Sequence, residues 1–147
     1  MIEVYIDGSC LGNPGNGGWA FLVINKGSIS SRSGYCLETT NNQMELTAAI
    51  KAIEFLINYE EILIYTDSSY VKNGITLWIE NWKKNNWMTV SKKTVKNKDL
   101  WLRLDQLNLS KNVEWQWVKA HNTSKHNNQV DQLARKAAET LTKSSFN

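Results

Sequence analysis

Cysteine is scarce in this chain, and long apolar runs are absent. The 147 residues include only Cys10 and Cys36, which form no C-x-x-C pair. Two such thiols cannot build a disulfide framework and do not indicate a zinc or redox site. No apolar run approaches the roughly 20 residues that span a bilayer, and residues 1–7 do not have the basic-then-apolar pattern of a targeting segment. We therefore expect reduced thiols and a cytoplasmic protein that does not associate with membranes.

Two common catalytic signatures are also missing. No G-x-S-x-G motif indicates a serine nucleophile. The glycine-rich stretch from Gly12 to Gly18 has Gly18 where a phosphate-binding P-loop has its lysine. We expect its glycines to turn the chain tightly beside Asp7 or to let the backbone approach a ligand.

Acidic residues are absent from residues 81–98, although the chain as a whole has 14. The same stretch contains six lysines, which exceed the net charge of +3 of the entire chain. A local concentration of this kind attracts a polyanion, and such binding weakens as salt rises. The alternative is that the lysines form a solvated face without a binding role, but six cations without an acid among them would repel one another unusually strongly. The lysines are Lys83, Lys84, Lys92, Lys93, Lys96 and Lys98.

The length and the 41% hydrophobic content fit one globular domain with a substantial core. The sequence shows no internal repeat. We expect a single domain over residues 1–142, a frayed tail over residues 143–147, and a monomer.

Apolar periodicity indicates an α/β domain. Residues 2–7 alternate as a half-buried strand does, and residues 19–24 and 31–36 follow as strands of an antiparallel meander. Leu46 to Ile57 has helical spacing, whereas Ile62 to Tyr65 is apolar without alternation, as in a parallel strand covered on both faces. Further helices are expected around residues 78–82, 100–107 and 130–141, and a last strand over residues 113–118.

Four acids stand where the chain is expected to change direction: Asp7, Glu45, Asp67 and Asp131. The strand assignments place Asp7 and Asp67 at the carboxyl ends of strands, where open α/β sheets bind ligands. Four gathered carboxylates stay ionised only around opposite charge, and their hard oxygens favour Mg²⁺ or Mn²⁺. The pattern predicts a metal site suited to phosphodiester cleavage.

Each acid also has a structural explanation. Asp7-Gly8 is a turn dipeptide, and Asn42-x-x-Glu45 has the spacing of a capping box. Asp67-Ser68 fits a helix cap, and Asp131 could complement a helix dipole. Taken singly, these structural roles are the more common ones.

Five separated motifs, taken together, resemble the type 1 ribonuclease H family over essentially the whole chain. The basic stretch resembles the protrusion of the free-standing bacterial enzymes. The resemblance implies the ribonuclease H-like fold, a mixed five-stranded sheet with an antiparallel meander plus parallel strands, flanked by helices. The motifs are Asp7-Gly8-Ser9 with Gly12 to Gly18, Thr39 to Leu46, Tyr65 to Ser68, Trp78 to Lys84, and Val118 to His121 followed by Asp131.

The resemblance also implies an activity. The enzymes of this family are endonucleases that hydrolyse the RNA strand of RNA–DNA hybrids with two metal ions, leaving 5′-phosphate and 3′-hydroxyl ends. By position, Asp7 bridges two Mg²⁺ ions, with Mn²⁺ as an alternative metal. Asp131 helps to hold the ion that activates water, Glu45 and Asp67 hold the ion at the departing oxygen, and His121 assists proton transfer or product release.

Substrate contacts follow from the same resemblance. Asn41 and Asn42 are expected to read 2′-hydroxyls, which distinguish RNA from DNA. Trp78 and Trp82 are expected to be partly exposed in a channel for deoxyribose, although paired aromatics on a helix are more often core. The remaining expected contacts are Cys10 and Asn13 beside the RNA, Thr40 and Asn81 as a DNA phosphate pocket, and Lys83, Lys84, Lys92 and Lys93 in the basic protrusion.

Four residues depart from the family pattern without touching the predicted metal ligands. We expect activity to survive, with altered affinity or metal preference. They are Glu38 in place of a basic residue, Ser69 in place of a longer amide, Ala120 in place of glycine, and Asn128 in place of an acid.

Three other functions fit parts of the sequence. A hybrid-binding module without cleavage would need no complete set of acids. Another metal-dependent nuclease of the same fold would use similar carboxylates, because fold does not fix function. A phospho-acceptor signalling domain would leave the basic stretch and the tryptophans without a purpose.

Overall fold

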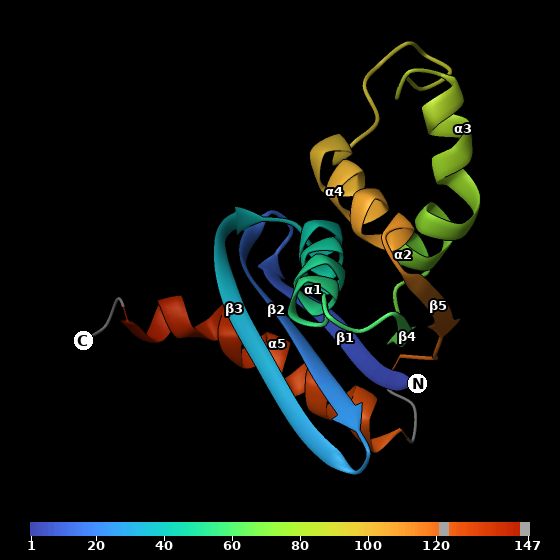
Figure 1. Cartoon of the computed structure of the whole chain (residues 1–147). Coiled ribbons are helices and arrows are strands. Elements are labelled where there is room, and N and C mark those ends of the chain that lie inside the picture. Colours follow the sequence, from blue (N-terminus) through green and yellow to red (C-terminus); the bar gives the residue numbers. More distant parts are fainter. Residues whose placement is uncertain (121–123, 145–147) are drawn as a thin grey trace.

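The computed structural model describes residues 1–120 and 124–144 and shows a mixed five-stranded sheet with the order β3-β2-β1-β4-β5 (Figure 1). Strands β1 (Ile2–Gly12), β2 (Gly15–Asn25) and β3 (Ser28–Thr39) form the expected antiparallel meander. Strands β4 (Glu61–Thr66) and β5 (Asn112–Trp117) extend the sheet in parallel. The predicted fold class is therefore confirmed.

Helices cover both faces of the sheet (Figure 1). Helix α1 (Asn41–Phe55) lies on one face beside α4 (Lys98–Leu109), and α5 (Lys125–Ser144) lies on the other. A second lobe stands beyond α1, built from α2, a π-helical turn, α3 and the loop that leads back to α4. Its elements are α2 (Ser69–Asn73), η1 (Gly74–Trp78) and α3 (Ile79–Lys84).

The two-residue period of the strands divides the core between these faces. Val4 and Ile6 join the large cluster under α1, whereas Tyr5, between them, packs against the cluster under α5. In β2, Phe21 contributes to the first cluster and Leu22 to the second. This alternation is the one expected of strands that are covered on both faces.

Asp7 does not end its strand, which corrects the sequence prediction. Strand β1 continues for five residues because β2 pairs with it in antiparallel register from Glu3↔Ile24 to Gly12↔Gly15. The Asp7-Gly8 turn is therefore wrong as well. The parallel pairing of β1 with β4 stops at Ile6↔Thr66. Asp7 therefore lies just beyond the end of β4, while its own strand continues alongside β2.

The glycine-rich segment serves packing and turning. Gly12 has φ +87° at the turn before β2, a conformation that glycine adopts at little cost. Gly18 lies against the backbone of α5, where a Cβ would collide with the Ala134 carbonyl and the Ala138 amide. The backbone at Gly18 therefore approaches helix α5. The prediction that these glycines let the backbone approach a ligand is wrong for Gly18.

Helix α5 reaches Ser144, and residues 145–147 lie outside the described part of the chain. Within the described ranges, no helix combines the length and apolarity needed to cross a membrane.

Candidate active site and nucleic-acid interface

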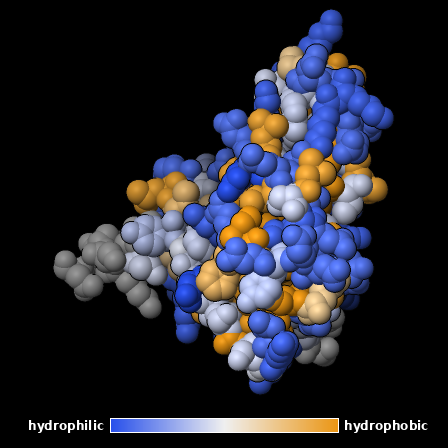
Figure 2. All heavy atoms as spheres, viewed as in Figure 1, coloured by the Kyte–Doolittle hydropathy of each residue, from blue (hydrophilic) through white to orange (hydrophobic). Residues whose placement is uncertain are grey.

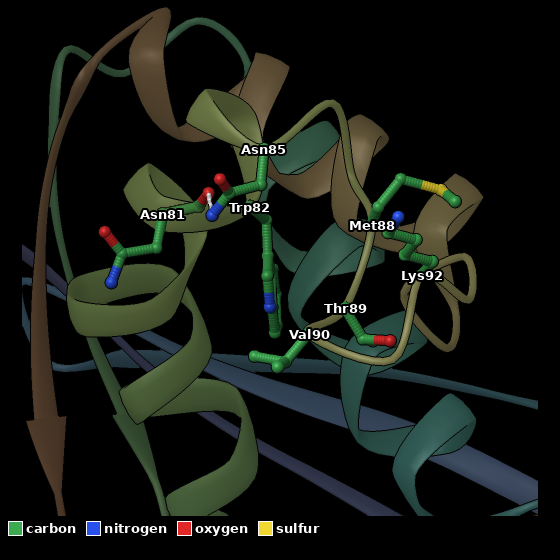
Figure 3. A pocket seen from close by; sticks show the side chains of 7 residues that line it. All are labelled: Asn81, Trp82, Asn85, Met88, Thr89, Val90 and Lys92. Carbon is green, nitrogen blue, oxygen red and sulfur yellow. Dashed lines mark hydrogen bonds between the residues drawn. The ribbon is translucent and has the colours of Figure 1, made fainter.

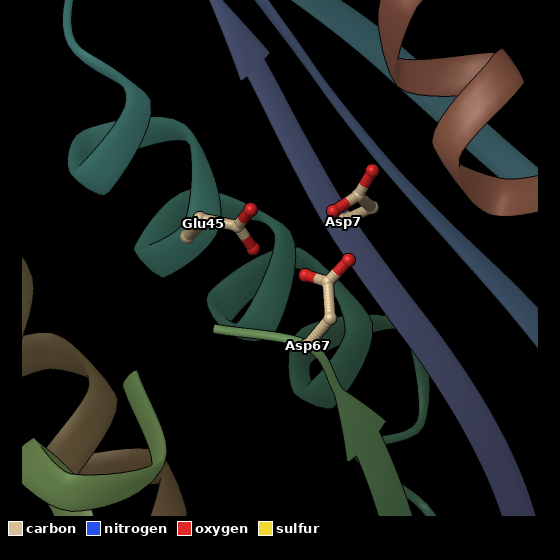
Figure 4. Close-up of side chains that lie close together, drawn as sticks. All are labelled: Asp7, Glu45 and Asp67. Carbon is tan, nitrogen blue, oxygen red and sulfur yellow. The ribbon is translucent and has the colours of Figure 1, made fainter. Parts of the chain in front are cut away.

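Three acidic side chains from separate elements converge at the centre of the sheet (Figure 4). Asp7 comes from β1, Glu45 from α1, and Asp67 from the bend after β4. One carboxylate oxygen from each lies within 4.8 Å of the others. Asp7 and Glu45 are only 2% and 5% exposed. Residues far apart in the sequence thus form a compact set of oxygen donors, of which those of Asp7 and Glu45 are buried.

Local structure explains why Glu45 points inward. The Thr40 hydroxyl accepts a hydrogen bond from the Gln43 amide at 3.2 Å and caps α1, so the helix begins at Asn41. Glu45 then falls on the buried face. Gly8 permits this approach, because a Cβ there would collide with the Glu45 amide nitrogen. The predicted capping box of Asn42 and Glu45 is therefore wrong.

Asp67 is held between two local hydrogen bonds. The Ser68 amide donates to Thr66 Oγ1, and the Ser68 hydroxyl accepts from the Val71 amide, each at 3.1 Å. Ser68 thus caps α2, as one alternative had suggested. The Asp67 carboxylate points towards Asp7 and Glu45 (Figure 4).

Burial and mutual repulsion oppose ionisation of the two innermost acids. Burial, followed by the charges of Glu45 and Asp67, raises the pKa of Asp7 to about 11. Burial, followed by the charge of Asp67, raises the pKa of Glu45 to about 8. Asp7 Oδ2 and Glu45 Oε2 are buried and accept no hydrogen bond from the residues that the structure describes. Such a donor set fits a hard divalent cation, which would supply the missing positive charge.

The three carboxylates line a cavity of about 340 Å³, here called the carboxylate cavity. Asp131 also lines this cavity but lies outside the compact group of three. Arg135, one turn further along α5, contacts Asp131 Oδ2 through Nε at 3.2 Å. The first turn of α5 contains no acid, so the helix-dipole alternative for Asp131 is wrong. The Asp-x-x-x-Arg spacing was readable in the sequence and indicates this ion pair.

The predicted RNA contacts gather around the first turn of α1. Asn41 and Asn42 line the carboxylate cavity. The Asn41 amide donates to Asn13 Oδ1 at 3.0 Å, and the Cys10 thiol donates to the Thr39 carbonyl at 3.3 Å. The structure therefore brings these residues together, whereas His121 lies outside the described residues.

Two of the four departures from the family pattern, together with an unpredicted tyrosine, reach this cavity. Ser69 and Ala120 line it, as does Tyr70. The Tyr70 hydroxyl accepts hydrogen bonds from Asn97 Nδ2 at 3.1 Å and Trp101 Nε1 at 3.0 Å. No sequence pattern singled out Tyr70, because its partners lie 27 and 31 positions away.

A second cavity of about 620 Å³ opens between α3 and the loop that follows it (Figure 3). It brings Asn81, Trp82 and Lys92 together, three of the predicted contacts. Thr40, the other residue predicted for the phosphate pocket, does not line this cavity and caps α1. The complete lining is Asn81, Trp82, Asn85, Met88, Thr89, Val90 and Lys92.

The tryptophans are both packed and accessible. Trp82 stacks edge-on against the buried Trp101, with ring centroids 5.2 Å apart, yet remains partly exposed. Trp78 is 38% exposed and lies 6.0 Å from Trp82, centroid to centroid. The expectation of partial exposure is confirmed for both, and Trp82 also contributes to the core as the alternative held.

Lys83 differs from the other lysines of the basic stretch. Its Nζ contacts Asp105 Oδ2 of α4 at 2.8 Å and Glu80 Oε1 at 3.5 Å. The hydrogen bond to Asp105 raises the pKa of Lys83. Figure 2 shows mainly hydrophilic residues over α3 and the following loop. Exposed lysines in this region are Lys84, Lys92, Lys93 and Lys96.

Sequence comparison matches the chain to one family. The RNase H family model matches residues 1–139. Ribonuclease H of Hydrogenovibrio crunogenus is 50% identical over 141 residues, covering 96% of this chain and 97% of the relative. Ribonuclease H of Escherichia coli is 49% identical over 138 residues, covering 94% and 89%.

Solved structures give the same result. The crystal structure of LC9-RNase H1, described as a type 1 RNase H with the type 2 active-site motif, superposes with a TM-score of 0.82 at 32% identity, covering 93% of this chain and 71% of that one. LC11-RNase H1 in complex with RNA/DNA hybrid shares the fold, with a TM-score of 0.74 at 22% identity, covering 97% and 99%. Fold and acidic cluster together define a nuclease domain. The chain belongs to the ribonuclease H family.

Proposed function

We propose that this enzyme hydrolyses the RNA strand of RNA–DNA hybrids endonucleolytically, by a two-metal-ion mechanism that leaves 5′-phosphate and 3′-hydroxyl ends. The main supporting observation is the group of three carboxylates, in which Asp7 and Glu45 each have a buried oxygen that accepts no hydrogen bond from the described residues. Identity of about half to relatives named Ribonuclease H supports the choice of substrate. So does the shared fold of a protein solved with a hybrid.

Asp7, Glu45 and Asp67 hold divalent metal in this proposal, and Asp131 completes the set from α5. Bound Mg²⁺, or Mn²⁺ in its place, would lower the pKa of the attacking water and offset charge on the departing oxygen. No side chain then has to act as a nucleophile. His121 remains the proposed residue for proton transfer or product release.

Arg135 has a defined part in this arrangement. Its Nε contacts Asp131 Oδ2 at 3.2 Å, while Asp131 also lies within hydrogen-bonding reach of Asp7. The Arg135 guanidinium would therefore compete with a bound metal ion for the Asp131 carboxylate.

Recognition of the hybrid is divided between two surfaces. Asn41 and Asn42, beside the carboxylates, hydrogen-bond 2′-hydroxyls, with Cys10 and Asn13 behind them. The DNA strand crosses the tryptophan surface, where Asn81 lies beside Trp78 and Trp82, and the exposed lysines neutralise its phosphates. Lys83 instead positions α3 against α4 through Asp105. We expect the enzyme to act as a cytoplasmic monomer.

A cleavage assay tests the proposal. Labelled RNA–DNA hybrid, double-stranded DNA and double-stranded RNA are incubated with the enzyme in Mg²⁺, with and without EDTA. Cleavage of the hybrid alone, abolished by EDTA, is expected. Equal cleavage of double-stranded DNA would indicate another nuclease of this fold, and binding without cleavage would indicate a hybrid-binding module.

A further inference from the structure

A chain of polar side chains joins the basic segment (residues 81–98) to the helix that carries Glu45. The Thr39 hydroxyl donates to Gln43 Oε1 at 2.8 Å. Gln43 Nε2 donates to Asn97 Oδ1 at 3.2 Å, and Asn97 Nδ2 donates to the Tyr70 hydroxyl at 3.1 Å. Trp101 Nε1 completes the chain on the same hydroxyl at 3.0 Å.

This network lies between the two proposed contact surfaces. Gln43 belongs to the first turn of α1, beside Asn41 and Asn42, and Tyr70 lines the carboxylate cavity. Asn97 is the last residue before α4 and lies near the end of the basic segment. A cavity of about 450 Å³, lined in part by Gln43, Val95 and Asn97, separates α1 from this end of the loop. The side-chain amides therefore bridge a gap that apolar packing does not fill.

The backbone at Asn97 indicates that its side chain is needed. Its φ of +61° and ψ of 28° are left-handed, a conformation in which glycine is the least strained residue. Asparagine tolerates it and adds an amide that both accepts from Gln43 and donates to Tyr70. Paired amide hydrogen bonds fix a direction and a register, which apolar contacts do not.

We infer that Asn97, with Gln43 and Tyr70, is a positioning residue that fixes the basic segment in register with the carboxylate cavity, so that one polyanion engages both. This inference rests on the proposed function. When two contact surfaces are held rigidly, one ligand that reaches both loses its translational and rotational freedom only once, so it binds more tightly. This gain in affinity disappears when the relative position of the two surfaces varies. The gain in affinity is also absent for a ligand that is too short to reach both surfaces.

Asn97→Gly tests the inference, because glycine keeps the backbone conformation and removes only the amide. The matched control is Asn86→Gly, which changes an exposed asparagine of the same segment with φ +53°. Each variant is assayed on a long hybrid and on one shortened until lysine substitutions no longer alter kcat/KM. We expect Asn97→Gly to lower kcat/KM roughly tenfold on the long hybrid, mainly through KM, and to leave the short hybrid unchanged.

Three results would overturn the inference: an equal loss on both hybrids, no loss on either, or the same loss in Asn86→Gly. A double-mutant cycle adds a second criterion. Gln43→Met should cost roughly tenfold alone and nothing further when combined with Asn97→Gly, whereas a combined loss of about a hundredfold would show independent sites.

Amide hydrogen exchange over residues 94–98, measured without substrate, separates this inference from the proposed function. Exchange should be faster in Asn97→Gly than in the wild type or Asn86→Gly. If the wild type cleaves no hybrid, the proposed function fails while the exchange result still decides whether the segment is held by Asn97. Unchanged exchange would overturn the inference.

Discussion

Asp7 is the residue at which burial and proposed function conflict most strongly. Its carboxylate is 2% exposed, and its neighbours are acids. Asp7→Asn should abolish hybrid cleavage while retaining hybrid binding, because the basic segment is untouched. The same variant should raise the metal-free Tm by roughly 3–10 °C near neutral pH, because it removes about 1–3 kcal/mol of the cost of keeping a buried carboxyl protonated.

Cleavage and thermal denaturation in EDTA measure these effects, with Asp99→Asn at an exposed position as the control. Full activity of Asp7→Asn in Mg²⁺ would refute the assignment of Asp7. An unchanged Tm would show that its carboxylate is not under strain.

At the residue scale, the sequence indicated which acids come together but not how they are held. Spacing alone placed Asp7 at a strand end, whereas pairing with β2 extends β1 beyond it. Lys83 looked like a free cation because its partner, Asp105, lies on another helix. Contacts of this kind depend on tertiary structure and leave no local pattern.

At the scale of elements, the amino end of α1 holds Asn41, Asn42 and Glu45 in place. Its cap is the Thr40 hydroxyl. Thr40→Ala should cost about 1 kcal/mol of unfolding free energy and lower kcat/KM on hybrids, because the first turn frays. Thr40→Ser retains the hydroxyl and should restore both. Chemical denaturation and hybrid kinetics provide the two measurements, and full function of Thr40→Ala would show that the cap does not position these residues.

The basic segment is the second element with a testable role. Replacing Lys84 and Lys92 by alanine should flatten the dependence of log K on log salt by about 2 and leave the rate at saturating hybrid largely unchanged. The control variant replaces Lys51 on α1 and Lys136 on α5 by alanine, which removes the same amount of charge outside the basic segment. Binding titrations across a salt series decide the matter, since equal slopes for the two double variants would exclude the segment as a phosphate contact.

The elements themselves were predictable, because apolar periods of 2 and 3.6 directly reflect which face is buried. The apolar residues at the predicted spacing lie in the core, among them Val4 and Ile6 in β1, Leu46 and Ile53 in α1, and Val130 in α5. Ile57 is an exception: it lies beyond the end of α1 and is 51% exposed. The closeness of packing was not predictable. Gly8 and Gly18 looked like loop glycines, yet each lets a helix backbone touch a strand.

At the scale of the whole molecule, the acidic cluster couples stability to pH. The pKa of Glu45 is raised to about 8 and that of Asp7 to about 11, both above their ordinary values. The native state therefore binds more protons than the unfolded state, and metal-free stability should fall as pH rises from about 4 towards these values. Denaturation in EDTA from pH 5 to 9 measures this fall.

Saturating Mg²⁺ should restore the stability lost at pH 8, because the ion binds only the folded site. Asp7→Asn should remove about half of the pH dependence below pH 8, because Glu45 keeps a pKa raised by burial and by the charge of Asp67. Stability that rose with pH in EDTA would contradict the raised pKa values.

The central claim is that buried, protonated carboxylates bind divalent metal, and calorimetry tests it most directly. Mg²⁺ is titrated into metal-free enzyme at pH 7.5 in two buffers with different ionisation enthalpies. We predict binding with release of at least one proton, because the metal displaces protons from Asp7 and Glu45, and loss of this signal in Asp7→Asn. Binding without proton release, or equal binding by Asp7→Asn, would contradict the account.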